Sequence, residues 1–522
     1  MKRSQLLMAA MAILGPWTAA ENIPPERLIA WDPGVRDGIP DYPVTIRLAA
    51  EDFDDGSEAD AAAVIQRAID ESPVPGAVVL PEGTFSLKDG IRMKSGVVLR
   101  GQGLDRTRLI VNAPHLSWHG AINFQAEFVA DERRILGGYE AGSRELKLEC
   151  TEGLAAGMMA LIRSENDLDA MYGSNKTWLE AGTTWARRTV GQIVEITEVR
   201  SESVLIDTEA RLSRMHLQPT MVPFEPVRDA GIEGLHIRRD DTAGDFIVLF
   251  ARAVNCWVRD CELEFAMRSH VQIMHSRHLT IESNYIHHAR NYGGGGHGYG
   301  ISLGSGSSDC LIWNNVFRML RHAMLTGGGG NGNVWAYNYS QEQHQEGGGS
   351  GCDLSVHGHY PYMELFEGNR VEYAMSTDWW GAAGPLVTFF RNRLDTSTHA
   401  HGAKIPLRIQ YASHRQNVIG NSLVSGQSIY VSEDSEDAWV EGNLVRGRKI
   451  WNAVEAFPLP PSLFLTTRPH FWDETPWPAI GADVDFEALE HGRGFHEIPA
   501  QQWARRILDE GEAMPFRQRH TP

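Results

Sequence analysis

The sequence predicts an all-β solenoid built from three-sided coils, that is, a β-helix. A short pattern recurs in the C-terminal half: an alternating apolar strand, a small or polar residue, and then Asn. Its intervals are 23, 31, 23, 31, 23, 29 and 22 residues, a base period near 23 with insertions of 6 to 8, which indicates a solenoid. Each unit holds three short alternating strands without helical periodicity, and this suits one three-sided coil. The repeated positions are Cys261, Asn284, Asn315, Asn338, Asn369, Asn392, Asn421 and Asn443.

We expect the repeated Asn side chains to form a structural column. Asn tolerates a left-handed backbone in a tight turn, and its amide can bond to the Asn of the coils above and below. The Asn column therefore predicts that the coils stack in register, and we assign it a structural role and not a catalytic one.

The composition excludes several classes of protein. Of 522 residues, 52 are Gly, but 42% are hydrophobic and 15 are Trp, which is too apolar for a disordered or collagen-like chain. The net charge of −19 argues against nucleic acid and anionic membranes as partners, because phosphate binding relies on clustered Lys and Arg. A polyanionic substrate would need a local basic patch or a bridging cation.

The N-terminus has the layout of a secretory signal. Lys2 and Arg3 precede an apolar stretch over 6–17, and small residues follow at 18–20. The stretch is too short to span a membrane, and no later window is long enough. We therefore expect residues 1–20 to be removed, a secreted or periplasmic location and no membrane insertion; the alternative is a buried N-terminal helix.

Five Cys residues are too few and too irregularly spaced for a disulfide framework or a zinc site built from Cys. In an oxidising compartment, Cys256 with Cys261 and Cys261 with Cys310 are the two pairings open to the chain.

The N-terminal segment resembles a known superfamily. Its motifs are AspAspGlySerGluAlaAsp at 54–60, AlaValIleGlnArgAlaIleAsp at 63–70, ValValLeuProGluGlyThrPhe at 78–85 and GlyValValLeuArgGlyGlnGly at 96–103. In order and spacing they are similar to the start of the pectate-lyase-like, right-handed parallel β-helix superfamily, with Phe85 in the place of a Tyr. The resemblance implies a right-handed β-helix whose first coil is capped by an α-helix. It leaves the chemistry open, because this fold also hosts hydrolases, epimerases and phage or adhesive proteins.

The chain divides into five predicted segments. After the signal, residues 21–130 form the N-terminal cap and first coils, 131–228 a small antiparallel β insertion, 229–455 the β-helix with a groove, and 456–522 a C-terminal cap. The insertion either borders the groove, through a loop with Trp178 and Trp185, or only covers a coil. We expect a monomer.

Register predicts which side chains leave the stack on one face. In the strand after the variable corner, alternation places these residues inward: Ile301, Leu303, Ala323, Leu325, Leu354, Val356, Leu407 and Ile409. The outward set is His322, Asp353, Ser355, His357, Arg408 and Gln410. His322 and Asp353 would then be neighbours in one column, with Asp378 next.

Gly-rich insertions at 291–299, 344–352 and 398–404 fall at the corner before this strand. Loops beside outward basic and aromatic residues are typical of a groove for an extended polymer, in which Trp stacks on sugar rings and Arg or Lys takes acidic groups. The Gly runs lack a nucleotide-binding motif, and the pair His357 and His359 is only half of a zinc site. The expected substrate-binding residues are Arg321, His297, His359, Trp379, Trp380 and Gln410.

The resemblance implies, for a groove of this kind, cleavage of an acidic polysaccharide by β-elimination. That reaction needs a neutralised carboxylate, a base for the C5 proton and an acid for the leaving oxygen. Arg408, or Ca²⁺ held by Asp353 and Asp378, would neutralise the uronate. Lys404 or His322 would be the base, and His357 would protonate the leaving group.

Two rival functions stay open. An inverting hydrolase needs two carboxylates about 6.5 to 9.5 Å apart, which Asp353 and Asp378 would provide. However, only His357-Gly358-His359 and Arg408-Ile409-Gln410 resemble the motifs of polygalacturonase-like β-helices. The other rival is a non-catalytic carbohydrate-binding or surface protein.

Overall fold

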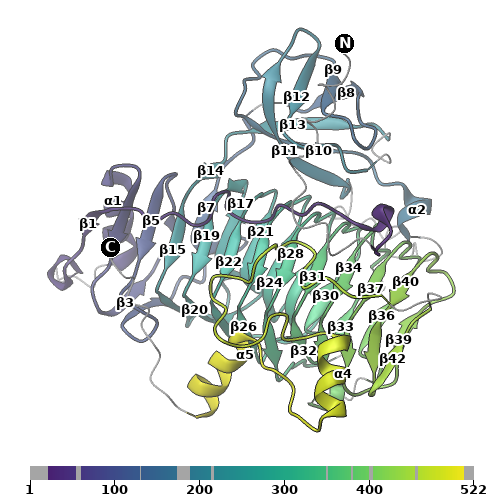
Figure 1. Ribbon diagram of the computed structural model, residues 1–522. Helices are drawn as coiled ribbons and strands as arrows, with labels where there is room; N and C mark the ends of the chain where they lie inside the picture. The colour runs from purple at the N-terminus through teal and green to yellow at the C-terminus, as the bar shows by residue number, and fades with distance from the viewer. Residues whose placement is uncertain are drawn as a thin grey trace, which may run out of the picture.

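The computed structural model describes residues 22–53, 60–129, 131–172, 188–212, 217–347, 351–377, 380–398, 404–452 and 457–510. It is a right-handed parallel β-helix of three long sheets, which confirms the predicted fold class (Figure 1). Each coil runs through sheet 1, sheet 2 and sheet 3 in that order. The predicted signal at 1–20 lies outside the described residues.

Sheet 1 holds one strand from almost every coil, paired in parallel from first to last. Its strands, in spatial order, are β1 (Val44–Arg47), β2 (Gly76–Val79), β5 (Val97–Arg100), β15 (Gly231–Glu233), β19 (Trp257–Arg259), β22 (Thr280–Glu282), β25 (Leu311–Trp313), β28 (Val334–Ala336), β31 (Leu365–Glu367), β34 (Thr388–Phe390), β37 (Asn417–Ile419) and β40 (Trp439–Glu441).

Sheet 2 follows one short corner later. Its strands are β3 (Gly83–Leu87), β6 (Thr107–Val111), β16 (His236–Arg239), β20 (Glu262–Ala266), β23 (Tyr285–Ala289), β26 (Val316–Arg318), β29 (Tyr339–Gln341), β32 (Arg370–Val371), β35 (Arg393–Leu394), β38 (Ser422–Leu423), β41 (Asn443–Val445) and β42 (Arg448–Ile450). The last strand, β42, runs antiparallel to β41.

Sheet 3 follows the corner in which the insertions were predicted. Its strands are β4 (Ile91–Arg92), β7 (Gly120–Gln125), β17 (Phe246–Ala251), β21 (Ser269–Met274), β24 (Tyr299–Gly304), β27 (His322–Thr326), β30 (Leu354–Val356) and β33 (Ala374–Met375), continued by the pair β36 (Leu407–Ile409) and β39 (Ile429–Val431). A small parallel pair, β14 (Val227–Arg228) and β18 (Ala253–Val254), lies at the corner after it.

A break in the alternation, which we call the bulge, recurs near the start of the sheet 3 strands, where two consecutive residues point inward while the strands stay in register. In three coils two consecutive residues, Ala121 with Ile122, Ile247 with Val248, and Ala323 with Met324, all belong to the interior core. In β24 the first of these positions is Gly300, where a Cβ would collide with Ala323 O and Phe317. Two inward residues in succession shift the alternation of every later side chain in the strand by one position.

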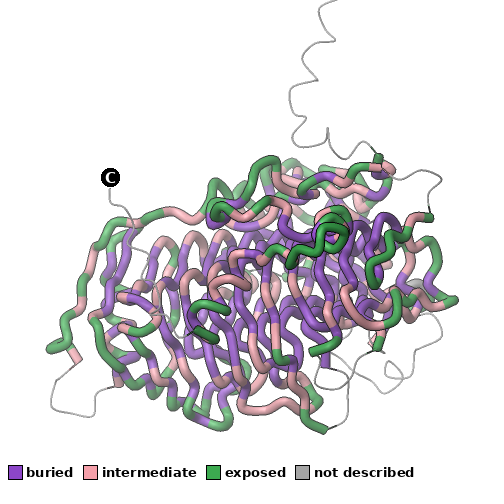
Figure 2. Tube along the Cα trace, turned by 60° about the horizontal axis from the view of Figure 1, so that its bottom comes forward, coloured by how far each residue is buried: buried purple, intermediate pink, exposed green. Residues whose placement is uncertain are grey.

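The interior is one continuous apolar core along the axis (Figure 2). Helix α1 (Ala61–Glu71) begins it: Asp60 caps the helix by accepting from Ala62 N, and Ile65 and Ile69 pack inward on the first coil. The expected inward residues Ile301, Leu303, Ala323, Leu354, Val356, Leu407 and Ile409 all belong to this core.

The Asn column lies at the corner between sheets 1 and 2, as predicted. Asn338 Nδ2 donates to Asn369 Oδ1 at 3.0 Å and to Ile312 O at 2.9 Å, and its Oδ1 accepts from Asn315 N at 3.0 Å. The same bonds recur from Asn284 to Asn443. One expectation is corrected: the left-handed residue is the one before each Asn, such as Tyr337 with φ 56°.

Cys256, Cys261 and Cys310 form no disulfide among the described residues, so neither pairing open to the sequence is present. All three are buried, and each thiol donates to a backbone carbonyl two residues earlier. Burial raises the pKa of Cys256 to about 12, so this thiol is unreactive and its role is to pack in the core.

A segment at 22–43, which we call the strap, runs along the outside of the stack in the direction opposite to chain growth (purple in Figure 1). It includes a 3₁₀ turn (Pro25–Arg27), and a second 3₁₀ turn (Ala50–Phe53) follows β1. Its contacts, in order, are Arg27 with Asp437, Trp31 Nε1 with Met363 O, Gly34 N with Asp309 O, and Tyr42 Oη with Asp229 O. The strap therefore links coils that are more than 200 residues apart in sequence.

The predicted insertion is a closed antiparallel barrel seated on the corners after sheet 3 (Figure 1). Its strands are β8 (Arg133–Gly137), β9 (Glu145–Leu148), β10 (Met159–Arg163), β11 (Gly191–Val199), β12 (Ser203–Ile206) and β13 (Thr220–Phe224), with a short helix α2 (Leu168–Tyr172). Arg277 of the β-helix bonds to Asp207 of the barrel at 2.7 Å and to Asp309 at 2.8 Å. This buried ion-pair network fixes the barrel on the stack.

The C-terminal tail does more than cap the last coil. Helix α4 (Ala482–Glu490) packs on β41 and β42, and α5 (Pro499–Ala504), continued by a π-helical turn (Arg505–Asp509), lies many coils earlier. Its contacts run back along the stack: Arg391 with Asp483 at 2.7 Å, Leu463 N with Glu367 at 2.9 Å, and the rings of Phe471 with Trp313 and Trp503 with Tyr285. Among the described helices, none has the length and apolar character needed to cross a membrane.

Replacing Asn338 with Ala removes one rung of the buried column. It leaves the backbone and amide donors of Asn315 and the carbonyl of Ile312 without their partner. At about 1–3 kcal/mol for each of these three buried groups, we expect the free energy of unfolding in urea to fall by about 3 kcal/mol or more. Asn452→Ala, at an exposed Asn beyond the column, should change it by less than about 1 kcal/mol. Equal effects of the two substitutions would show that the column carries no special stability.

Candidate functional site

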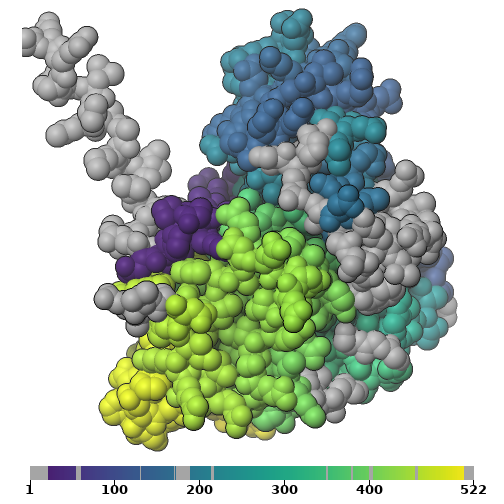
Figure 3. All heavy atoms as spheres, turned by 90° about the vertical axis from the view of Figure 1, so that its right-hand side faces the viewer, coloured from purple at the N-terminus to yellow at the C-terminus, as the bar shows by residue number. Residues whose placement is uncertain are grey.

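The outer side of sheet 3 lies between two borders, and we call it the sheet 3 face. The barrel and its helix line one border, where Asn331 Nδ2 donates to Gly191 O at 2.9 Å and Ala382 N to Met171 O at 2.9 Å. The corners that hold the predicted insertions line the other. Figure 3 views the C-terminal end of the stack, with the barrel above the late coils and the strap beside them. The loop with Trp178 and Trp185 lies outside the described residues.

The recurrent bulge decides which side chains reach this face. One outward column contains Leu249, Gln272, Ser302, Leu325 and Ser355. Leu325 was expected inside, so that prediction is wrong, because the doubled inward position at Ala323 and Met324 moves it to the outside. Ser355 is outward as expected but fully covered.

His322 lies before the bulge and stands beside Cys352, not beside Asp353. Its Nδ1 is 3.0 Å from Cys352 O, and its ring is 5.0 Å from Tyr299 and 5.9 Å from His357. Burial, and then the charge of Arg321, hold the pKa of His322 well below its usual range. The imidazole is therefore neutral, but it is only 1% exposed and lies beneath the surface of the face.

Asp353 points into the stack, which corrects the prediction that it lies outward as a metal ligand. It occupies the extra inward position of the bulge, beside Ala323. Its carboxylate accepts from Ser340 Oγ at 2.6 Å and from the N–H groups of Glu372 and Tyr373 at 2.9 Å. Burial raises the pKa of Asp353, and burial and then the charge of Asp353 raise the pKa of Glu372. The proposed partner, Asp378, lies outside the described residues, as does Trp379.

His357 is the half-buried imidazole at the centre of the face. Its ring lies 5.9 Å from His322 and 6.3 Å from Trp380, measured between ring centroids. Trp380 lies at the barrel border and also contacts His359 at 6.3 Å. His359 itself is buried, and burial lowers its pKa to about 3, with the neighbouring His357 adding to the effect.

The other predicted residues occupy different parts of the face. Arg408 is half-buried and outward, in register with Tyr430. Lys404 is exposed at the corner before it. Gln410 follows on the same side, but its amide already donates to Thr377 O at 2.6 Å. His297 lies at the tip of the first Gly-rich corner, with Nδ1 2.8 Å from Gly294 O.

Three arginine–aromatic pairs follow the border of the face where the insertions lie. Measured from guanidinium carbon to ring centroid, Arg268 lies 4.8 Å from Trp118, Arg321 5.8 Å from Tyr299 and Arg408 6.0 Å from Tyr373. Trp118 is 60% exposed, whereas Tyr299 and Tyr373 are almost fully buried. The pairs span the coils from β7 to β36, seven steps of about 4.8 Å or roughly 34 Å in all.

The sequence reasoning missed Trp118, Arg268, Tyr299 and Tyr373. Trp118 and Arg268 are separated by 150 residues, and Asp245 holds them together by accepting from Trp118 N at 2.7 Å and from Arg268 Nε at 3.1 Å. The available signal was their common place, at or just before the start of a sheet 3 strand. It was hidden in the N-terminal coils because the insertion interrupts the repeat there.

The comparison with protein families supports the resemblance found in the sequence. The family model described as "Rhamnogalacturonase A/epimerase, pectate lyase-like" matches residues 53–128. The start of the β-helix is pectate-lyase-like. This match covers α1 and the first coils, so it concerns the N-terminal part of the stack and not the candidate residues of β27 to β36. No curated protein matches the chain significantly in sequence.

Solved structures with similar folds are distant in sequence. The tailspike gp61 of Pseudomonas phage phi297 gives a TM-score of 0.49 at 12% identity, covering 74% of this chain and 68% of that one. The tailspike gp54 of Acinetobacter baumannii bacteriophage AP22, solved with a capsular saccharide, gives 0.46 at 11%, covering 74% and 65%. PfbA, a surface adhesin of Streptococcus pneumoniae, gives 0.40 at 13%, covering 77% and 92%. At this distance the likeness concerns the β-helix alone.

The low pKa of His359 predicts that the folded protein loses stability as the pH falls. Between about pH 3 and pH 6.5 the unfolded chain holds a proton on this imidazole that the folded chain excludes, so stability falls as the pH falls. From pH 7 to pH 5 this group alone should cost about 2 kcal/mol.

The measurement is urea unfolding at both pH values. His359→Asn, which suits the positive φ of 56° at this position, should lose about 2 kcal/mol less than the wild type on acidification. His491→Asn, at an exposed position on the tail, should behave as the wild type. An unchanged loss in His359→Asn would show that this ring does not control the acid response.

Proposed function

We propose that the protein is an extracellular carbohydrate-active enzyme that cleaves an extended acidic polysaccharide by β-elimination on the sheet 3 face. The observation that carries the proposal is the line of arginine–aromatic pairs beside a half-buried His, on a protein whose net charge is −19. A guanidinium binds a carboxylate through two parallel hydrogen bonds, and an aromatic plane packs on the apolar face of a sugar.

The two ends of the line, together with the exposed Lys404, provide the outer contacts of a long substrate. Trp118 and Arg268 lie at the N-terminal end, where Asp245 fixes both in place. Arg408 and Lys404 lie at the C-terminal end. A local concentration of positive charge is what an acidic polymer requires to approach an acidic protein, because the field near a lined groove can oppose that of the whole molecule.

The chemistry is assigned to the C-terminal half of the face. Arg408 neutralises the uronate carboxylate, which makes the C5 proton more acidic. Lys404 is assigned as the base that removes that proton, the C4–O bond breaks to leave a C4=C5 double bond, and His357 gives a proton to the leaving oxygen. His322, buried behind His357, is assigned a positioning role. With Asp353 turned inward, Arg408 takes the part that was expected of Ca²⁺.

Purified protein should release unsaturated ends, seen as ultraviolet absorbance, from at least one polymer in a panel of uronate polymers and neutral glycans. Replacing His357 with Gln removes the acid and should lower the rate by about 100-fold or more. His491→Gln, an exposed His on the tail, should keep the wild-type rate. New reducing ends without unsaturation would mean hydrolysis, and tight binding without either product would mean a binding protein; both results contradict the proposal.

The Trp118 and Arg268 pair should matter only for long substrates, because it lies several coils from His357. Trp118→Ala or Arg268→Gln should raise KM for the polymer by roughly tenfold, equivalent to about 1.4 kcal/mol, with kcat unchanged. Fragments too short to reach β7 should show no change. Arg493→Gln, at an exposed Arg of the tail, is the matched control. An equal effect on short and long substrates would contradict this placement.

A further inference from the structure

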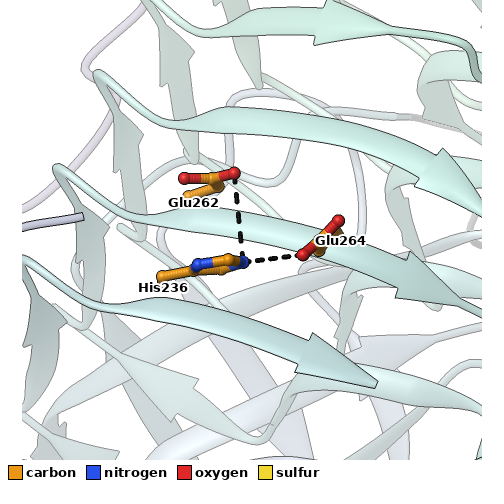
Figure 4. A group of neighbouring side chains, drawn as sticks. All are labelled: His236, Glu262 and Glu264. Carbon is orange, nitrogen blue, oxygen red and sulfur yellow. Dashed lines mark hydrogen bonds and ion pairs between the residues drawn. The ribbon is translucent and has the colours of Figure 1, made fainter. Parts of the chain in front are cut away.

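A second group of ionisable side chains lies on the outer side of sheet 2, away from the sheet 3 face. His236 of β16 stands directly beside Glu262 of β20 in the parallel register, and Glu264 lies two residues further along on the same side. Figure 4 shows the three side chains pointing toward one another. Each residue is less than a tenth exposed.

One nitrogen and two carboxylates converge in this cluster. His236 Nε2 lies 2.8 Å from Glu264 Oε1 and 3.9 Å from Glu262 Oε1. One donor atom from each residue lies within 4.8 Å of the other two. Ligands at about 2.0–2.1 Å from a tetrahedral ion are about 3.3 Å apart, which falls between the two measured separations.

A chain of contacts orients Glu262 from the other side. His287 Nε2 lies 3.1 Å from Glu262 Oε1, and its Nδ1 lies 2.7 Å from His288 Nδ1. The His287 ring also stacks on Tyr285 at 4.0 Å. A carboxylate that is held in this way is typical of metal sites, in which partners behind the ligands fix their geometry.

The contacts within the cluster leave one nitrogen of His236 unsatisfied. His236 Nδ1 is buried without a hydrogen-bond partner in the part of the chain that the structure describes. If the proton of a neutral ring sits on Nδ1, the Nε2 lone pair faces two carboxylates, an arrangement that a bound cation would stabilise. If it sits on Nε2, it bonds to Glu264, while Glu262 lies 3.9 Å away and is held by His287 instead. Arg238 also approaches Glu264, at 3.6 Å, but its Nε is bonded to Asp240.

We propose that His236, Glu262 and Glu264 bind a divalent transition-metal ion of the Zn²⁺ type. Imidazole together with carboxylates suits Zn²⁺ better than Ca²⁺, which prefers six to eight oxygen ligands. The ion would join two successive coils, and through His287 it would involve a third. Its role is to stabilise the stack, since the cluster contributes to no part of the sheet 3 face.

The test uses the purified full-length protein, treated with a chelator, dialysed and then titrated with Zn²⁺ at pH 7.5. We expect one Zn²⁺ per chain that depends on the cluster, and a higher midpoint of thermal unfolding. Glu264→Gln and His236→Gln should lose this ion and the thermal shift. His287→Ala should weaken binding by about 10- to 100-fold, because it removes only the group that holds Glu262.

His115→Gln is the matched control, because it removes a His that pairs with the carboxylate of Asp89 on the surface. It should retain full binding. If Glu264→Gln fails to fold, Glu262→Gln replaces it, and circular dichroism of the metal-free proteins verifies folding. The proposal is overturned if the wild type binds no Zn²⁺, if the cluster variants bind as the wild type does, or if Ca²⁺ produces the same thermal shift.

Discussion

The structure depends on the buried ladder of Asn amides between sheets 1 and 2. Each side chain uses its donor and acceptor on neighbouring coils, so the height and register of every coil are set at this one corner. Because Asn315 and Asn338 are buried, a slip would leave several polar groups without partners. The corner therefore stays short and constant. All length variation is displaced to the corners that border sheet 3, and this is why the candidate site lies there.

A second constraint, the recurrent bulge in sheet 3, decides which side chains reach the surface. The period and the Asn column were sufficient to predict the coils, the face and the outward direction of His357 and Arg408. They were not sufficient to predict the bulge, because two apolar residues in succession, such as Ala323 and Met324, are also compatible with plain alternation in a buried strand. The predicted alternation of inward and outward side chains was wrong by one position. It was enough to turn Asp353 from a surface ligand into a buried acceptor.

What the sequence could not show are contacts between segments far apart in the chain. The strap, the barrel and the tail bind the stack through pairs such as Trp31 with Met363, and no local pattern encodes them. Trp118 and Arg268 form their pair for the same reason, since the insertion separates their coils. The cluster on sheet 2 is different. His236 and Glu262 are 26 residues apart, close to one coil, so a search at the repeat period for ionisable pairs would have found it.

The two sites follow from the same geometry, which places outward residues of successive coils about 4.8 Å apart. On sheet 3 that spacing produces a line of separated guanidinium and aromatic groups, which suits a substrate longer than any single pocket. On sheet 2 it brings one His within reach of two carboxylates, which suits a single ion. In a solenoid the same register can thus produce either a long surface or a small ligand cluster. The lengths of the outward side chains decide which of the two forms. If the proposed ion is bound at His236, its loss would therefore loosen the coils that support Arg268 and Tyr299 without removing any of the contacts proposed for the polymer.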